Sequence, residues 1–248
     1  MSSIRENALV LRTRNYGEKN RVAVLLTENH GVISAFVNGA RSLNSRNAAA
    51  TSQFVYGSYL LTESKENYTV KESQPEANYG DMGADIEALA LAQYFCELCM
   101  ELAPENTPAA EYLRLLRGAL HYLSSAGRDK RLIKSAFEMR ILTISGFMPD
   151  IVMCSSCGAY EAEKMMFYPA SGTITCGKCD NGTGGIALSS GALTALRHCV
   201  LADMKKLFSF AVSDEALDSL GKASERYLLA CLDRSFKALE FYRSLRIN

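Results

Sequence analysis

The sequence lacks a net charge, because its 27 lysines and arginines are matched by 27 aspartates and glutamates over 248 residues. Bulk electrostatics therefore gives no sign of a nucleic-acid binder. Any surface that binds nucleic acid must concentrate its basic residues in one region of the chain.

Long apolar segments are also missing. No run of about 18 apolar residues is present, which argues against a membrane-spanning helix. Residues 1–7 have no apolar core of the kind that a secretory signal needs. With 48% hydrophobic and 22% charged residues, the chain is typical of a folded protein with more than one core. We expect a cytoplasmic protein with no membrane partner.

Enzyme motifs are scarce. The phosphate-binding pattern G-x-x-x-x-G-K-[ST] does not occur, and Gly177-Lys178 stands between two cysteines instead. Of the three histidines, His30 lies in a predicted turn, whereas His121 and His198 lie in predicted helices. Their spacing nominates no Ser/His/Asp set, so we expect no catalytic residue and no enzyme activity.

Cysteine, by contrast, is plentiful, and four of the eight cysteines form two C-x-x-C pairs separated by 18 residues. Two such pairs can place four thiolates tetrahedrally around one Zn²⁺. A disulfide scaffold is less suitable for a chain of this length without a signal peptide. Four cysteine ligands leave no open position for water, so the zinc is expected to be structural. The predicted ligands are Cys154, Cys157, Cys176 and Cys179.

The spacer between the pairs predicts a zinc ribbon over residues 150–185, with a strand at Met165–Tyr168 and a turn at residues 171–173. A third C-x-x-C, formed by Cys96 and Cys99, lies inside a predicted helix. There we expect core packing rather than redox chemistry, because free cysteine behaves as a small hydrophobic residue. Cys199 and Cys231, in other helical runs, are interpreted in the same way.

The first 80 residues have the pattern of a small β-barrel. Short segments rich in β-branched and aliphatic residues are separated by turn-forming residues and by one polar connection over residues 39–53. An OB-fold is the leading prediction for five such strands, and an SH3-like barrel is the alternative. The predicted strands are Asn7–Thr13, Arg21–Thr27, Val32–Val37, Phe54–Thr62 and Tyr68–Glu72.

Helical periodicity follows, so the whole chain is predicted to be multidomain α+β. An all-α domain is expected over residues 81–149 and 186–248, with the zinc ribbon inserted into it. Thr107 and Pro108 favour the start of a helix at that point. The predicted helices are Asp85–Ala103, Thr107–Leu123, Asp129–Ser145, Ser189–Lys206 and Ser213 to the end.

Charge is distributed unevenly. Residues 1–62 hold seven basic and three acidic residues, a local charge of +4 in a neutral chain. Positive charge can follow a nucleic-acid backbone, and aromatic rings can stack on bases. The candidate rings, each of which could pack inside the barrel instead, are Tyr16, Phe36, Phe54, Tyr56 and Tyr59. The predicted DNA-binding residues, through phosphates, are Arg14, Lys19, Arg21, Arg41 and Arg46.

Several motifs resemble the RecO family across essentially the whole chain. Residues 8–11, 15–20 and 25–31 resemble its opening strands, and Val37–Arg41 resembles its glycine-alanine-arginine turn. The most specific match comes from residues 137–142 and 146–149, which lead directly into Cys154 and Cys157. The sequence departs from the family pattern at residues 42–46. At this place the family usually has further basic residues and a lysine-serine pair, and this chain has Ser-Leu-Asn-Ser-Arg instead.

The resemblance implies a nucleoid-associated DNA repair and recombination mediator. Such proteins bind single- and double-stranded DNA and anneal complementary strands. With RecR and sometimes RecF, they help to load recombinase onto DNA coated by single-strand-binding protein. A zinc-ribbon OB-fold transcription or RNA-binding factor is the alternative function.

The resemblance also implies that the helical domain captures the acidic, apolar-ended tail of single-strand-binding protein. That tail needs an apolar slot edged with positive charge. One candidate stretch has Lys205 and Lys206 beside Leu201 and Leu207. The other has Arg226, Arg234 and Lys237 beside Tyr227 and Phe241. For either stretch, an ordinary packed and solvated helix remains an equal alternative.

Overall fold

The computed structural model describes residues 2–42, 45–64, 67–82, 85–125 and 127–246, without the side chains of Arg46 and Asn67. The chain divides into two compact units. Unit 1 comprises residues 1–125 and 236–248, and unit 2 comprises residues 126–235. The division expected from the sequence, into a barrel, a helical domain and an inserted ribbon, stays a prediction.

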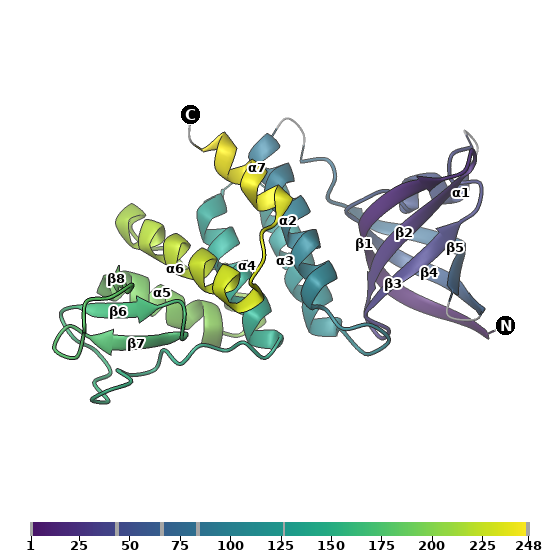
Figure 1. Ribbon diagram of the computed structural model, residues 1–248. Coiled ribbons are helices and arrows are strands. Elements are labelled where there is room, and N and C mark those ends of the chain that lie inside the picture. The colour runs from purple at the N-terminus through teal and green to yellow at the C-terminus, as the bar shows by residue number, and fades with distance from the viewer. Residues whose placement is uncertain (1, 43–44, 65–66, 83–84, 126, 247–248) are drawn as a thin grey trace. The chain divides into compact units, whose positions relative to one another are not determined.

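Unit 1 contains a closed five-stranded barrel with the strand order β1-β2-β3-β5-β4 (Figure 1). Neighbouring strands are antiparallel except for the parallel pair β3–β5, and β1 also pairs with β4. This connectivity is that of an OB-fold, which confirms the leading prediction over the SH3-like alternative. The strands are β1 (Ser2–Tyr16), β2 (Asn20–Thr27), β3 (Val32–Val37), β4 (Val55–Ser64) and β5 (Asn67–Asn78).

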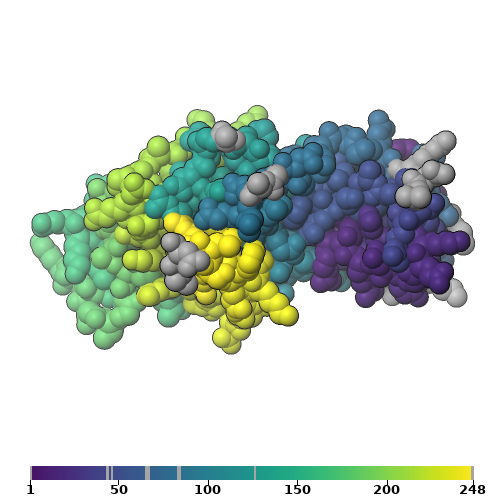
Figure 2. Space-filling view, turned by 90° about the horizontal axis from the view of Figure 1, so that it is seen from above, coloured from purple at the N-terminus to yellow at the C-terminus, as the bar shows by residue number. Residues whose placement is uncertain are grey.

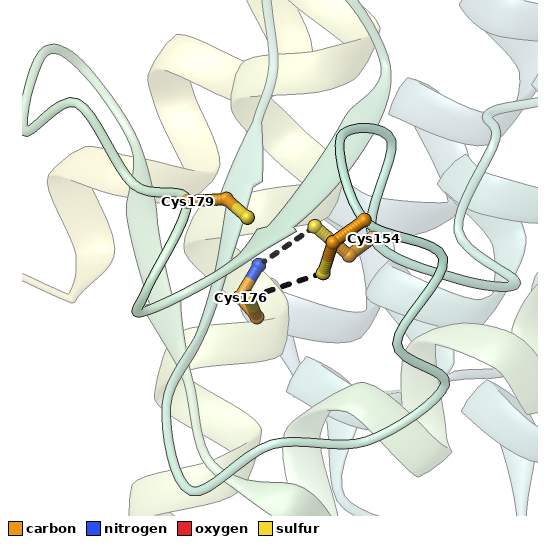
Figure 3. A group of neighbouring side chains, drawn as sticks. Cys154, Cys176 and Cys179 are labelled. Carbon is orange, nitrogen blue, oxygen red and sulfur yellow. Dashed lines mark hydrogen bonds between the residues drawn. The ribbon is translucent and has the colours of Figure 1, made fainter.

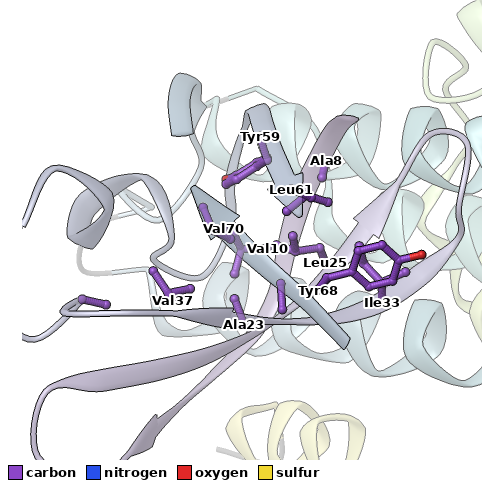
Figure 4. Close-up of a cluster of buried hydrophobic side chains, with 12 residues drawn as sticks. Ala8, Val10, Ala23, Leu25, Ile33, Val37, Tyr59, Leu61, Tyr68 and Val70 are labelled. Atoms are coloured by element: carbon purple, nitrogen blue, oxygen red, sulfur yellow. The ribbon is translucent and has the colours of Figure 1, made fainter. Parts of the chain in front are cut away.

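The inside of the barrel is filled by alternate residues of its strands, among them Val10, Leu25 and Leu61, which are fully buried (Figure 4). A short helix, α1 (Arg46–Ala50), lies in the polar connection of residues 39–53. The hydroxyl of the buried Tyr59 donates a 2.6 Å hydrogen bond to the Ala50 carbonyl and so holds this helix on the barrel. Burial raises the pKa of Tyr59, so the hydroxyl remains a donor.

The β2–β3 turn joins the barrel to the helices of unit 1 through backbone hydrogen bonds. The Val32 amide donates to the Pro104 carbonyl at 2.9 Å, and the Asn106 amide donates to the His30 carbonyl at 3.0 Å. The buried carboxylate of Glu6 also contacts this turn, with Oε1 at 2.9 Å from Nδ1 of His30. Because these bonds join main-chain atoms, they require a close approach that a larger residue at Gly31 would prevent.

Three helices complete unit 1: α2 (Ile86–Leu102), α3 (Ala110–Ser124) and α7 (Lys237–Leu245). The side chain of Asp85 caps α2 by accepting a hydrogen bond from the Ala88 amide. Phe236, just before α7, contacts the ring of Tyr94 on α2, and Figure 2 shows the yellow α7 lying on the surface of this unit. Cys96 and Cys99 are fully buried on α2, as predicted.

Unit 2 combines a helical core with a small sheet of strand order β7-β6-β8. Its core holds a buried charge network, in which Lys134 lies 2.8 Å from both Glu138 and Glu225, and Ser224 donates to Glu138. Each buried charge is therefore paired. The elements are α4 (Lys130–Ile144), β6 (Met165–Tyr168), β7 (Thr173–Cys176), β8 (Ile186–Leu188), α5 (Ser190–Leu201), the 3-10 helix η1 (Met204–Lys206) and α6 (Asp214–Leu232).

Three predicted helices differ from the structure. The helix predicted over Ser189–Lys206 ends at Leu201, and η1 follows it as a separate 3-10 helix. The helix predicted from Thr107 begins instead at Ala110, without a side-chain cap. The last helical run is not continuous, because Asp233 adopts a left-handed conformation with φ of 47° and ends α6. The remainder, α7, belongs to unit 1. Within the described ranges, no helix has the length and apolar character needed to cross a bilayer.

Replacing Gly31 with alanine tests the joint between the β2–β3 turn and the helices. The glycine has φ of +63°, and an added Cβ would lie 1.9 Å from the Pro104 carbonyl oxygen. We expect the free energy of unfolding to fall by roughly 2–4 kcal/mol, measured by chemical denaturation. Gly39→Ala is the matched control, because its φ is +66° but a Cβ there meets nothing within 4 Å. Its destabilisation should be only about 1 kcal/mol, and equal destabilisation by both variants would contradict the proposed joint.

Candidate metal centre and nucleic-acid interface

Four cysteines of unit 2 converge on one point. Cys154 and Cys157 lie in the loop after α4, Cys176 is the last residue of β7, and Cys179 follows in the next turn. Their sulfur atoms all lie within 4.8 Å of one another. Figure 3 shows the side chains of Cys154, Cys176 and Cys179 directed toward a common centre. The chain therefore brings together all four ligands that the cysteine spacing predicted.

The geometry and electrostatics of this cluster suit a metal ion. Tetrahedral Zn–S bonds of about 2.3 Å separate the sulfurs by about 3.8 Å, and Sγ of Cys157 and Cys176 are 3.6 Å apart. The Cys176 amide donates to Sγ of Cys154 at 3.3 Å. Backbone donors, with this amide first, lower the pKa of Cys154 to about 6. The pKa of Cys176 is lowered mainly by the Cys179 amide. These amides favour thiolates, the form that binds metals.

A buried arginine of α5 holds the first cysteine pair in place. Nε of Arg197 donates to the Ile151 carbonyl at 2.9 Å, and Nη2 donates to the carbonyls of Val152 and Tyr160 at 2.8 and 2.6 Å. Its guanidinium also lies 4.0 Å from the centroid of the Tyr160 ring. These contacts bracket Cys154 and Cys157 on both sides. The sequence reasoning missed Arg197, for which the only signal was a charge among apolar helix positions.

A second candidate site lies on the outer face of the barrel. In an antiparallel sheet, paired residues point to the same face. Arg14 of β1 pairs with Val22 of β2, which in turn pairs with Phe36 of β3. Arg12 of β1 pairs with Val24 of β2. Arg12 and Arg14 are exposed, and Tyr16 continues the same row of β1. Arg12 was not among the predicted DNA-binding residues, although its spacing of two from Arg14 was a usable signal.

The tip of the β1–β2 hairpin adds two further cations. Nη1 of Arg41 donates to the Gly17 carbonyl at 3.0 Å, and the Arg41 amide donates to the Lys19 carbonyl at 3.0 Å. Both side chains are exposed. Chain segments some 20 residues apart therefore place Lys19 and Arg41 next to each other, close to Arg14 and Tyr16.

The other two predicted cations have different positions. Nη1 of Arg21 donates to the carbonyls of Ala48 and Thr51 at 3.1 and 3.2 Å, so this guanidinium holds α1 against the barrel. The side chain of Arg46 lies outside the described part of the chain. A DNA contact by either residue stays a prediction.

The candidate rings separate clearly by burial. Phe54, Tyr56 and Tyr59 are buried, but of the three only Tyr59 belongs to the cluster that fills the barrel, as the alternative interpretation expected. The ring of Tyr56 lies under the guanidinium of Arg117 on α3. Tyr16 is 54% exposed, and its ring meets that of Phe36 edge-on at a centroid distance of 5.6 Å. Of the five candidate rings, this pair alone lies on the outer face with the basic residues.

The predicted partner-binding residues of unit 2 are all exposed. Lys205 and Lys206 lie on η1 near the exposed Leu201, whereas Leu207 is buried and cannot line a slot. Arg226 lies on α6 and Arg234 just beyond it. Tyr227, expected beside them, is buried, and Phe241 belongs to unit 1.

Comparison with known proteins identifies the family of this chain. Residues 1–79 match the family model described as Recombination protein O N terminal, and residues 83–240 match Recombination protein O C terminal. The chain belongs to the RecO family. It is 32% identical to the DNA repair protein RecO of Acetivibrio thermocellus, over 99% of this chain and 98% of the relative.

Other relatives match over similar lengths. The DNA repair protein RecO of Symbiobacterium thermophilum is 31% identical over 97% of this chain and 96% of the relative. That of Alkaliphilus metalliredigens is 29% identical over 98% and 99%. Membership of the RecO family assigns this chain to DNA repair and recombination, and the family resemblance seen in the sequence is confirmed.

Replacing Cys176 with serine tests the metal centre of this RecO-family chain. We expect the purified protein to hold about one zinc per chain, and the variant to hold almost none because three thiolates bind Zn²⁺ far less tightly. Metal analysis gives the content, and hydrogen exchange should show faster opening of residues 150–185. Cys231→Ser is the control, since Cys231 is a free cysteine of α6 outside the cluster. Full zinc content in the Cys176 variant would refute the ligand assignment.

Proposed function

We propose that this chain binds single- and double-stranded DNA on the outer face of its barrel and anneals complementary strands. The observation that carries the proposal is the grouping of Arg12, Arg14, Lys19 and Arg41, all exposed, around one end of the β1–β2 hairpin. In a chain without net charge, such a group is a localised positive surface. OB-folds bind oligonucleotides on the face of strands 2 and 3 and on the loop between strands 1 and 2.

The mechanism is electrostatic. Two DNA strands repel each other through their phosphates, and cations on the protein reduce that repulsion while releasing counterions into solution. The free energy of bringing the strands together then falls, and base pairing completes the reaction. No covalent bond is made or broken, so the proposed role is that of a mediator and not of an enzyme.

One Zn²⁺ bound by the four cysteines has a structural part in this proposal. It would cross-link the two cysteine pairs and so fix the ribbon. With all four positions taken by thiolates, the ion leaves no site for a reacting water.

Changing Lys19 and Arg41 together to alanine tests the barrel surface. Affinity for DNA of any sequence should fall alike. On single strands, the slope of log affinity against log salt should flatten by about 0.7 for each phosphate that the protein no longer neutralises. Fluorescence anisotropy at several salt concentrations measures both quantities. The rate of nucleotide-independent annealing should fall in parallel.

The matched control removes two charges from another part of the barrel, where Arg5 and Lys71 are exposed and Arg5 is paired with Glu72. The variant with Arg5 and Lys71 changed to alanine should bind and anneal nearly as well as the original chain. Equal weakening in the two double variants would place the DNA surface elsewhere. Sequence-selective binding without annealing would favour a transcription or RNA-binding factor.

Partner binding forms a second part of the proposal. We propose that the chain acts with RecR and RecF and that unit 2 captures the acidic tail of single-strand-binding protein. The support is the exposed pair Lys205 and Lys206 beside Leu201, of which 55% is exposed, since an apolar residue next to two cations suits an acidic, apolar-ended peptide. Arg226 and Arg234 remain a second candidate, with less apolar surface beside them.

Titration with the tail peptide distinguishes the two candidates. Binding should weaken with salt and disappear when Lys205 and Lys206 become glutamate, because the reversed charges repel the acidic peptide. The variant with Arg226 and Arg234 changed to glutamate is matched in charge and should bind normally. Weaker binding by this second variant alone would assign the tail to α6. No binding by the unaltered chain would refute the tail as a partner.

A further inference from the structure

The outer face of the barrel exposes an aromatic ring beside its basic residues. Tyr16 ends β1 with 54% of its surface in solvent. Its ring is held by the edge of Phe36 on β3, with the two ring planes inclined at 75°. Within the described residues, the side chain of Tyr16 has no hydrogen bond or ion pair, and Phe36 is its aromatic neighbour.

The surroundings of Tyr16 have the charge of a nucleic-acid-binding surface. Arg12 and Arg14 precede it on the same face of β1, at intervals of two residues. Lys19 and Arg41 lie at the hairpin tip that follows, where they outnumber Glu18. A strand running along β1 would therefore meet cations on both sides of the ring. This combination of a charged track and a ring is how OB-folds hold single strands.

Pre-organisation adds to the argument. A free tyrosine side chain loses rotamer freedom when a ligand stacks on it, and this loss weakens binding. The edge contact with Phe36 already restricts the Tyr16 ring in the unbound chain. Phe36 is itself half-buried on β3, so the supporting ring is fixed by the sheet.

We propose that Tyr16 is a base-stacking residue that makes the barrel surface select unpaired nucleobases over duplex DNA. In a duplex, neighbouring base pairs cover both faces of each base, so a protein ring cannot stack without unstacking the helix. An unpaired strand offers its base faces freely. The inference rests on the proposed DNA-binding face and adds to its phosphate contacts a contact that only single strands can make.

The test compares two probes that share a backbone and differ in their bases: an oligothymidylate and an abasic oligonucleotide of equal length. Tyr16→Ala should weaken binding of the oligothymidylate about tenfold, the order expected for one stacked base. Its affinity for the abasic strand and for duplex DNA should equal that of the unaltered chain. Tyr16→Phe keeps the ring and should bind all three probes normally, and Phe241→Ala removes a comparably exposed ring from α7 as a control.

A spectroscopic measurement reads the contact directly, because the chain contains no tryptophan. Tyr16→Trp introduces a single indole, whose fluorescence should be quenched by the oligothymidylate and not by the abasic strand. Phe241→Trp should respond to neither probe. This readout also covers the case in which Tyr16→Ala fails to fold.

The outcomes separate the two proposals. Equal weakening of both probes by Tyr16→Ala, or an indole that does not respond to bases, would overturn the stacking role while leaving phosphate binding in place. Failure of the unaltered chain to bind either probe would overturn the DNA-binding face and the stacking role together.

Discussion

The alternation of side chains in a closed barrel is the constraint on which unit 1 depends. Every strand must give one of its two faces to the interior, where residues such as Ala23, Leu25 and Leu61 fill the space completely. The other face is buried at Leu9 and Leu26, but towards the end of β1 it reaches solvent and carries Arg12, Arg14 and Tyr16 in consecutive outward positions. A shift of one residue in register would exchange the two sets, and would bury the cations while exposing the core. The packing of the interior therefore specifies which residues lie on the outer face of β1.

In unit 2, the loop of the first cysteine pair is held by a buried arginine. Arg197 directs its guanidinium to three backbone carbonyls around the first cysteine pair. The cost of burying a guanidinium is offset because its hydrogen bonds are made and Tyr160 covers one face. The loop of Cys154 and Cys157 is therefore held by hydrogen bonds to Arg197, which restrict its backbone on both sides of the cysteine pair.

Local patterns predicted much of this structure. The five strands, the start of α2 at Asp85 and the convergence of four cysteines follow from alternation, capping and spacing, which depend on near neighbours in the sequence. The features that were not predicted depend on contacts between residues that are far apart in the sequence. The hydrogen bonds of Arg21 to Ala48 and Thr51 had no signal in the sequence, because the residues that accept them lie 27 and 30 residues away. The break at Asp233 was also missed, since the residues after it pack on α2 and periodicity continues on both sides.

Because α7 belongs to unit 1, the two units are completed in a fixed order during translation. Ribosomes deliver the barrel first, but the helix that covers part of α2 emerges only after all of residues 126–235. Until then the ring of Tyr94 lacks its neighbour Phe236, and the Glu97 carboxylate lacks the Ala238 amide that donates to it. The second unit, made of one continuous stretch, has every residue that it needs before the first is complete. The unit that carries the proposed DNA-binding face is thus begun first and completed last.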